Sequence, residues 1–225
     1  MAIITRVYLV RHGETDANRN GIIQGQLDTP LNGVGIKQAS LVGEALRDVP
    51  FSMAYSSDLS RATRTAEAIL AHHPTLQVHE QKELRERDMG DMQGKSAQAL
   101  KGVRLVVSTD RTVESGPFFA ARAVTWWNRT ILQRTESLSQ EDHPQHILVT
   151  SHGGFIATLV QTLIQSRKLN SAPGIVIWGC VNSSVTIIEV NEKQKGVVIQ
   201  YGNTSHLEGA NLDNVVEENV DETQV

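Results

Sequence analysis

One local pattern recurs three times along the chain and constrains its fold more than any other feature: a short apolar run, a polar turn, and a helical pattern after it. The polar turns lie at residues 11–13, 56–61 and 151–154. Strands that alternate with helices predict an α/β fold, here a three-layer sandwich with a mostly parallel central sheet flanked by helices. Because ligands bind at the carboxyl ends of such strands, we expect the three turns to converge at one edge of the sheet.

Hydrophobic periodicity predicts the individual elements. We expect helices at residues 33–47, 59–70, 118–138 and 155–165, and strands at residues 6–10, 51–55, 76–79, 146–150, 185–190 and 197–201. The last two strands are expected to pair antiparallel across a turn at residues 191–196. Asn32 is the predicted N-cap of the first long helix, whose expected buried side comprises Ile36, Ala39, Leu41, Val42, Ala45 and Leu46.

The chain contains no linker-like stretch between residues 1 and 210, so we expect one domain there. Residues 95–117 show neither the helical nor the strand period of apolar residues and are interpreted as a small insertion over the functional site. Residues 211–225 contain acidic side chains but no Lys or Arg, which predicts an acidic C-terminal tail.

Composition excludes several classes of protein. The net charge of −4 argues against general nucleic-acid binding, which needs a surplus of cations on one face. No apolar stretch reaches the ~20 residues of a membrane span, and the N-terminus does not resemble a signal peptide. The one cysteine, Cys180, has apolar neighbours and is expected to be a buried thiol. We therefore expect a cytoplasmic location, with the nucleus as a second reducing compartment.

The residues of the three turns indicate an anion site. Arg11 and Arg61 offer rigid guanidinium forks that match phosphate oxygens, and the helices after Ser57 and His152 add positive dipole ends. Cationic neighbours disfavour the imidazolium form, so His12 in such a pocket is expected to be neutral and nucleophilic. The other imidazole, that of His152, can donate a hydrogen bond to the phosphoryl oxygens.

Phosphoester cleavage also needs a group that gives a proton to the leaving alkoxide and later takes one from water. Glu86 and Asp88 are the candidates, because their loop follows a strand expected to end at the same edge. The alternative for Glu86 is a surface ion pair with Arg85 or Arg87, which contributes little.

At these residues the chain resembles the histidine phosphatase superfamily, specifically its phosphoglycerate mutase-like branch. The resemblance rests on Leu-Val-Arg-His-Gly-Glu-Thr with Asn18, on Gln24-Gly25, on Ser56-Ser57-Asp58-Leu59 with Arg61, on the loop around Glu86, and on Ser151-His152-Gly153. Agreement is weaker at Glu114-Ser115 with Arg122 and at residues 182–185. Within the superfamily the likeness is greatest to fungal broad-specificity phosphatases.

The resemblance implies a role for each matched residue. His12 would be the phosphorylated nucleophile, Arg11, Arg61 and His152 would bind the phosphoryl group, and Glu86 would be the proton donor. Hydrogen bonds to the phosphate would come from Asn18 and the Gly153 backbone, and the substrate side would be lined by Thr15, Gln24 and Gly25. No cofactor or metal is implied.

The resemblance thus implies a phosphoglycerate mutase-like catalytic domain that hydrolyses phosphomonoesters of small metabolites without a metal. True mutases carry a longer basic insertion after the acid loop, so hydrolysis is favoured over transfer. Alternatives are mutase activity, fructose-2,6-bisphosphatase activity, and an inactive module that binds phosphorylated ligands. A metal hydrolase using His12, Glu14 and His152 is weaker, because carboxylate ligands are few.

Several other residues have two interpretations. Lys95, Lys101, Arg104 and Arg111 either recognise a second anionic group or are solvated surface, which is preferred. His206 either closes the site or packs, and packing is preferred. The histidines expected at the surface are His72, His73, His79 and His143. The late strands leave a sheet edge through which a homo-oligomer could pair.

Overall fold

The computed structural model describes residues 2–98, 111–133, 144–177 and 179–210. Seven strands form one sheet in the order β3-β2-β4-β1-β6-β7-β5. Their bounds are β1 (Ile3–Arg11), β2 (Phe51–Ser56), β3 (Val78–Glu80), β4 (Gln145–Ser151), β5 (Leu169–Ser171), β6 (Val185–Asn191) and β7 (Gly196–Asn203). All neighbours pair in parallel except β6, which is antiparallel to β1 and β7. The predicted mostly parallel sheet and its antiparallel late strands are confirmed.

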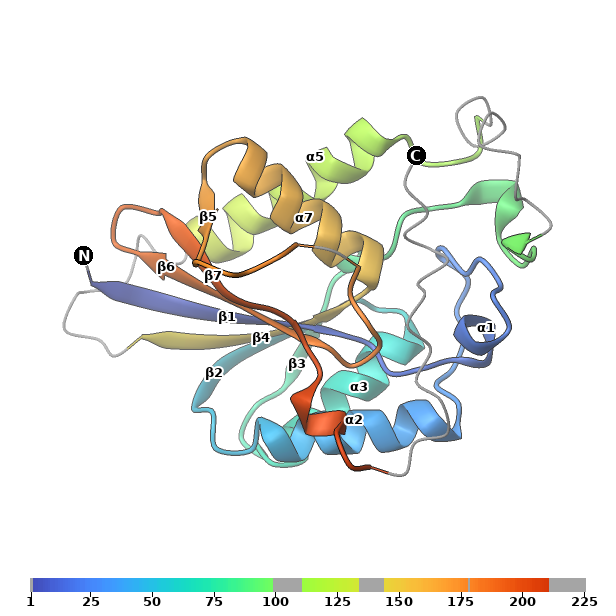
Figure 1. Ribbon diagram of the computed structural model, residues 1–225, viewed down its shortest axis with the longest axis horizontal. Helices are drawn as coiled ribbons and strands as arrows, with labels where there is room; N and C mark the ends of the chain where they lie inside the picture. Colours follow the sequence, from blue (N-terminus) through green and yellow to red (C-terminus); the bar gives the residue numbers. More distant parts are fainter. Residues whose placement is uncertain (1, 99–110, 134–143, 178, 211–225) are drawn as a thin grey trace.

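Helices cover both faces of the sheet, which makes three layers (Figure 1). One face carries α2 (Gly33–Ala45) and α3 (Ser60–Leu70), and the other carries α5 (Gly116–Trp127) and α7 (Gly153–Gln165). Separate apolar clusters fill the two interfaces, and Trp126 and Trp127 belong to the α5–α7 side. Short helical turns complete the order: α1 (Asp16–Arg19), η1 (Lys82–Leu84), η2 (Gly90–Met92), η4 (Asn128–Leu132) and η5 (Ser205–Leu207).

Bounds of three predicted helices were wrong, and the helix predicted at 155–165 already begins at Gly153. The helix predicted at 118–138 begins earlier, because the Ser115 hydroxyl accepts a hydrogen bond from Phe118 N and caps it at Gly116. After Trp127 it widens into the π-helical turn η4, and residues 134–138 lie outside the described part of the chain. Helix α2 begins after Asn32 as predicted, but it ends at Ala45 rather than at residue 47.

The predicted buried face of α2 was wrong in part: Ile36 is 61% exposed, and Ala45 is exposed as well. The helix instead turns Gly35 and Gly43 inward. A Cβ on Gly35 would overlap the backbone of Glu14, and a Cβ on Gly13 would overlap the carbonyl of Gly35. Helix α2 therefore lies backbone to backbone against the turn after β1, and this contact rather than hydrophobic periodicity sets its rotation.

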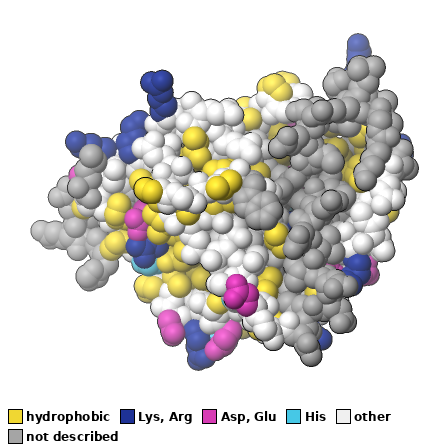
Figure 2. Space-filling view, in the orientation of Figure 1, with side chains coloured by type: hydrophobic (Ala, Val, Ile, Leu, Met, Phe, Trp, Pro, Cys, Tyr) yellow, Lys and Arg dark blue, Asp and Glu magenta, His cyan; other side chains and the backbone are white. Residues whose placement is uncertain are grey.

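The edge of the sheet beside the late strands is not open along its whole length. Strand β5 pairs with Gly196–Val198 of β7 and takes the outer position there. On the face drawn in Figure 2, the Lys and Arg side chains of the described residues stand singly or beside Asp and Glu. Among the described residues, no helix has the length and apolarity needed to cross a membrane.

Candidate active site

Strand register brings the polar turns to one edge of the sheet, as predicted. Arg11, the last residue of β1, pairs with Ser151 at the end of β4, and Ser56 at the end of β2 pairs with Thr150. Parallel pairing aligns these carboxyl ends. Because β6 is antiparallel, its beginning at Val185 meets the same edge beside Val10. The residues that follow or precede these ends converge although they are far apart in sequence.

His12 lies at the centre of this edge and is buried. Its Nδ1 lies 2.7 Å from the Gly13 carbonyl oxygen, and since a carbonyl only accepts, Nδ1 carries the proton. Its Nε2 accepts a hydrogen bond from Arg61 Nε at 3.3 Å. Burial, followed by the charges of Arg61 and Arg11, lowers the pKa of His12 well below its ordinary value. His12 is thus neutral with a lone pair on Nε2, as a nucleophile requires.

Two buried arginines flank His12, and each is held by backbone carbonyls. Arg61, in the first turn of α3, donates from Nη1 to Leu27 O at 2.7 Å and from Nη2 to Gly25 O at 2.8 Å. Arg11 donates from Nη1 to Cys180 O at 2.5 Å. These backbone acceptors orient the guanidinium groups, which stay positively charged at any ordinary pH and match the oxygens of an anion.

His152 is the N-cap of α7 and lies against His12, with 5.2 Å between the ring centroids. Its Nε2 is 2.9 Å from Ser57 Oγ, while Nδ1 has no hydrogen-bond partner among the described residues. Burial, followed by Arg61, His12, Arg11 and Arg122, lowers the pKa of His152 well below its ordinary value. We call Arg11, His12, Arg61 and His152 the phosphate floor.

Glu86 is buried at the same edge, which contradicts the surface ion pair considered for it. Its Oε1 accepts from Arg87 N and its Oε2 from Gly154 N, both at 2.9 Å. Arg85 forms a bidentate pair with Asp58 instead, at 2.7 and 2.6 Å. A carboxyl oxygen has two lone pairs, so a carboxyl group that accepts these hydrogen bonds can also carry a proton. Residues 83–88 are called the acid loop below.

The outer residues named by the resemblance lie close to the phosphate floor. They differ in how many of their polar atoms already form hydrogen bonds within the protein. Asn18 Oδ1 accepts from Thr15 Oγ1 at 3.0 Å, whereas Asn18 Nδ2 has no hydrogen-bond partner among the described residues. Thr15 and Gln24 are buried and bond to each other at 2.8 Å. Gly25 has φ +51°, and its carbonyl holds Arg61. Asn18 is thus the residue of this group best placed to donate to a phosphate.

Gly153 begins α7 directly after His152, so its backbone belongs to the helix end that faces the floor. The next residue, Gly154, contacts Glu86 so closely that a Cβ there would overlap Glu86 Oε1. The N-terminal turn of α7 therefore serves both the floor and the acid.

Sequence reasoning assigned no role to the segment that precedes β6. Asn182 Nδ2 and Ser183 N donate to the His12 carbonyl at 3.0 and 3.1 Å, and Arg11 N donates to Ser184 O. The Thr65 hydroxyl, in α3, also contacts the turn after β1 and accepts a hydrogen bond from Gly13 N at 3.0 Å. The resemblance at residues 182–185 was the only signal for this segment, because no local spacing links it to His12.

Other candidates are engaged elsewhere. Asp88 accepts from Gly90 N at 2.8 Å within its own turn. Glu14 Oε1 accepts from Arg19 and Asn32, both at 2.8 Å, and so secures the turn after β1. Among the described residues, no group of three or more His, Cys, Asp or Glu side chains could hold a metal.

The surface assignments of His72 and His79 are confirmed, because both residues are exposed. His73 is partly buried and packs edge-on against Phe51 at 5.1 Å, so its surface assignment was wrong. His206 is partly buried in η5, which contacts α2, and its preferred role in packing stays a prediction. Lys95 and Arg111 are exposed. The positions outside the described residues are Lys101, Arg104, His143 and the acidic tail.

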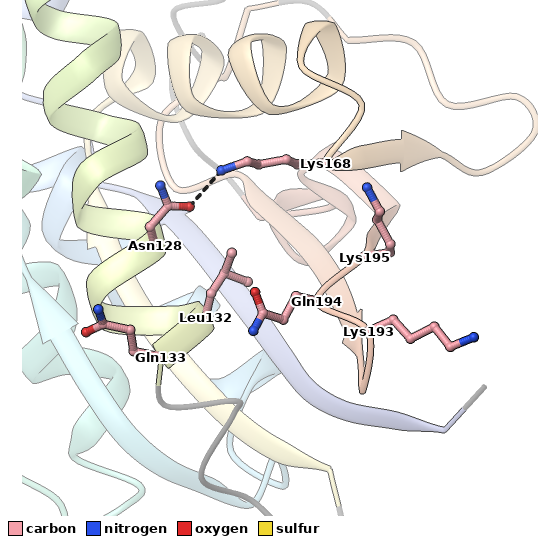
Figure 3. Close-up of a pocket in the computed structure, with 7 residues that line it drawn as sticks. All are labelled: Asn128, Leu132, Gln133, Lys168, Lys193, Gln194 and Lys195. Atoms are coloured by element: carbon pink, nitrogen blue, oxygen red, sulfur yellow. Dashed lines mark hydrogen bonds between the residues drawn. The ribbon is translucent and has the colours of Figure 1, made fainter.

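A pocket of about 380 Å³ lies at the opposite end of α7, beside Lys168 (Figure 3). Helix α7 has 13 residues and so separates this pocket from His152 by about 20 Å. Its lining combines Lys168, Lys193 and Lys195 with amides and Leu132, and Lys168 Nζ donates to Asn128 Oδ1 at 3.1 Å. Among the described residues, its lining contains no histidine and no carboxylate, in contrast to the site around His12.

Comparison with known proteins supports the same assignment. A family model described as histidine phosphatase superfamily (branch 1) matches residues 7–203. The chain is 35% identical over 210 residues to phosphoglycerate mutase-like protein 4 of Arabidopsis thaliana, covering 90% of this chain and 86% of that protein. It is 30% identical over 212 residues to a broad-specificity phosphatase of Saccharomyces cerevisiae, covering 91% and 88%.

A solved structure of mycobacterial glucosyl-3-phosphoglycerate phosphatase has the same fold, with a TM-score of 0.72 at 27% identity. The match covers 89% of this chain and 99% of that one. The fold, the sequence motifs and the relatives all indicate the same family, and the family model covers residues 7–203. The chain therefore belongs to the histidine phosphatase superfamily, branch 1, and is an enzyme with phosphoglycerate mutase-like relatives.

Proposed function

We propose that this enzyme is a metal-independent phosphatase that hydrolyses phosphomonoesters of small metabolites through a phosphohistidine on His12. The observation that carries the proposal is the Nε2 lone pair of a neutral, buried His12, with Arg61 at 3.3 Å. The arginines of the floor supply the positive charge that a metal ion would otherwise provide.

In the first step, Arg11, Arg61 and His152 hold the phosphoryl oxygens, and Asn18 Nδ2 donates a further hydrogen bond. The His12 Nε2 lone pair attacks phosphorus, and the bond between phosphorus and the leaving oxygen breaks. Glu86 gives its proton to that oxygen. A dianionic phosphate beside Glu86 disfavours the carboxylate form, so substrate binding itself favours the protonated acid.

In the second step, the Glu86 carboxylate takes a proton from a water molecule. The resulting oxygen attacks phosphorus, the bond between phosphorus and His12 Nε2 breaks, and inorganic phosphate leaves. Glu86 is then protonated and His12 unmodified, so the enzyme has returned to its starting state. The proposal includes action in the reducing cytoplasm, where the buried Cys180, the one cysteine of the sequence, stays a thiol.

The test is a panel of phosphorylated metabolites assayed with wild type and His12→Ala, in the presence and absence of a chelator. We expect turnover by wild type that is insensitive to the chelator, an acid-labile phosphohistidine during turnover, and neither signal in His12→Ala. Absence of phosphohistidine under rapid quench would overturn the intermediate. Dependence on a bisphosphate activator would indicate a mutase, and loss in chelator a metal enzyme.

A further inference from the structure

Arg122, in α5, directs its whole guanidinium group at the acid loop. Nη1 donates to the carbonyl oxygens of Glu83 and Arg85, both at 2.8 Å, and Nη2 donates to that of Glu86 at 3.1 Å. The remaining N–H groups, on Nε and Nη2, form a bidentate pair with the Glu114 carboxylate at 2.9 and 2.7 Å. These five hydrogen bonds use all five donors of an arginine.

Glu114 extends the same contact to the other end of the acid loop. Its carboxylate accepts from Asp88 N at 3.2 Å, and its carbonyl accepts from Arg87 Nε at 2.7 Å. The Phe119 ring lies 4.9 Å from the Arg122 guanidinium carbon and covers one face of it. One ion pair on the α5 side thus contacts backbone or side-chain atoms of most residues of the acid loop.

The acid loop needs such a contact because it has no strand of its own. Strand β3 ends at Glu80, and the acid loop begins within the short turn η1. The Glu86 carboxyl group must meet the leaving oxygen within hydrogen-bond reach, and this geometry depends on where the Glu86 backbone lies. Arg122 bonds to that backbone and not to the carboxyl group, so it acts through Glu86.

The geometry points to Arg122 as a positioning residue for the general acid, paired with Glu114. This inference rests on the proposed role of Glu86. Lysine is not equivalent at this position, because its three donors radiate from one atom and cannot reach three carbonyls and a carboxylate in one plane.

The experiment compares leaving groups. Protonation matters for an alkyl phosphate, whose alkoxide is a poor leaving group, and matters little for p-nitrophenyl phosphate. For Arg122→Gln we expect kcat/KM to fall roughly 100-fold on the best alkyl phosphate found for wild type and less than about 3-fold on p-nitrophenyl phosphate. Arg122→Lys, which keeps the charge, is expected to lose about 10-fold on the alkyl phosphate alone.

A chemical rescue adds a second measurement. Arg122 lines a pocket of about 420 Å³ beside Phe118 and Trp126, through which a small guanidinium compound can reach its position. Added methylguanidine is expected to restore alkyl phosphate turnover in Arg122→Ala but not in Glu86→Gln. The matched control is Arg129→Gln, which removes an exposed arginine of the same pocket. Arg129 forms an ion pair with the Glu83 side chain and no hydrogen bond to the acid-loop backbone among the described residues, so this variant is expected to leave kcat/KM on both substrates unchanged.

The outcomes separate this inference from the proposed function. An equal loss on both substrates in Arg122→Gln and Arg122→Lys, with no rescue, would overturn the positioning role. If Glu86→Gln itself lowers kcat/KM equally on both substrates, the assignment of Glu86 as the acid in the proposed function fails instead.

Discussion

The phosphate floor and the acid loop share one site but are held in different ways. Arg11 ends β1, and His12 and His152 directly follow β1 and β4, so strand register aligns their backbone; Arg61 lies in the first turn of α3. The acid loop lies outside the sheet and is held by side chains, chiefly Arg122 and the Arg85–Asp58 pair. Under the proposed function, phosphate binding would depend mainly on the sheet, whereas proton transfer would depend on a few side-chain hydrogen bonds.

The largest effect is expected from breaking the floor at Arg61. Arg61→Gln removes a charge next to His12 Nε2, and we expect kcat/KM to fall about 10³-fold or more on alkyl and aryl phosphates alike. Arg64→Gln is the matched control, because Arg64 lies on the same helix but is exposed and pairs with Glu67. A loss confined to alkyl phosphates would contradict the separation of the two regions.

Glu86→Gln should break only the acid side of the comparison. Its amide cannot give up a proton, so we expect roughly a 10²- to 10³-fold fall in kcat/KM for alkyl phosphates. The fall for p-nitrophenyl phosphate should be less than about 10-fold, since that leaving group needs little protonation. Steady-state kinetics on both substrates measure the difference, and equal losses would place Glu86 in binding rather than in proton transfer.

Gly154→Ala sharpens the comparison from the side of α7. The added methyl group overlaps Glu86 Oε1, so it should displace the carboxyl group without touching the floor arginines. We expect a loss of about 10- to 100-fold on alkyl phosphates and a smaller one on p-nitrophenyl phosphate. Gly116→Ala, at the open first position of α5, serves as the control for a helix-terminal alanine. Unchanged kinetics on alkyl phosphates would mean that the acid loop accommodates the methyl group without displacing the Glu86 carboxyl group.

The smallest expected effect concerns the stability of the folded protein and involves His12 and His152, two residues of the floor. The pKa values of His12 and His152 are lowered in the folded protein, so below the unfolded value of 6.5 the unfolded chain binds more protons. The free energy of unfolding should therefore fall as pH drops from about 7 to 5, by up to about 1.4 kcal/mol per pH unit for each histidine. Above about pH 7 these two groups contribute no slope.

Urea unfolding at several pH values checks this prediction. His12→Gln should lower the acid-side slope by at most one proton. An unaltered slope in His12→Gln would mean that this imidazole takes up its proton without unfolding.

The sequence predicted the floor more completely than its surroundings. Arg11, His12, Arg61 and His152 all follow strand-like runs, and strand ends are readable from local periodicity. The rotation of α2 was not readable, because the Gly13–Gly35 approach is a contact between backbones that hydrophobic periodicity does not record. His73 was misassigned for a similar reason: its packing against Phe51 is a tertiary contact of a polar residue.

What the sequence determined by itself is the fold class, the family and the residues of the floor, since recurring strand–turn–helix units and ordered motifs are local properties. Only the tertiary structure decided which tautomer His12 adopts, that Asn182 holds its carbonyl, and that Glu86 is buried against Gly154. It also decided that Arg122 reaches the acid loop. These properties depend on distances between segments that are far apart in the chain, and local sequence patterns do not record such distances.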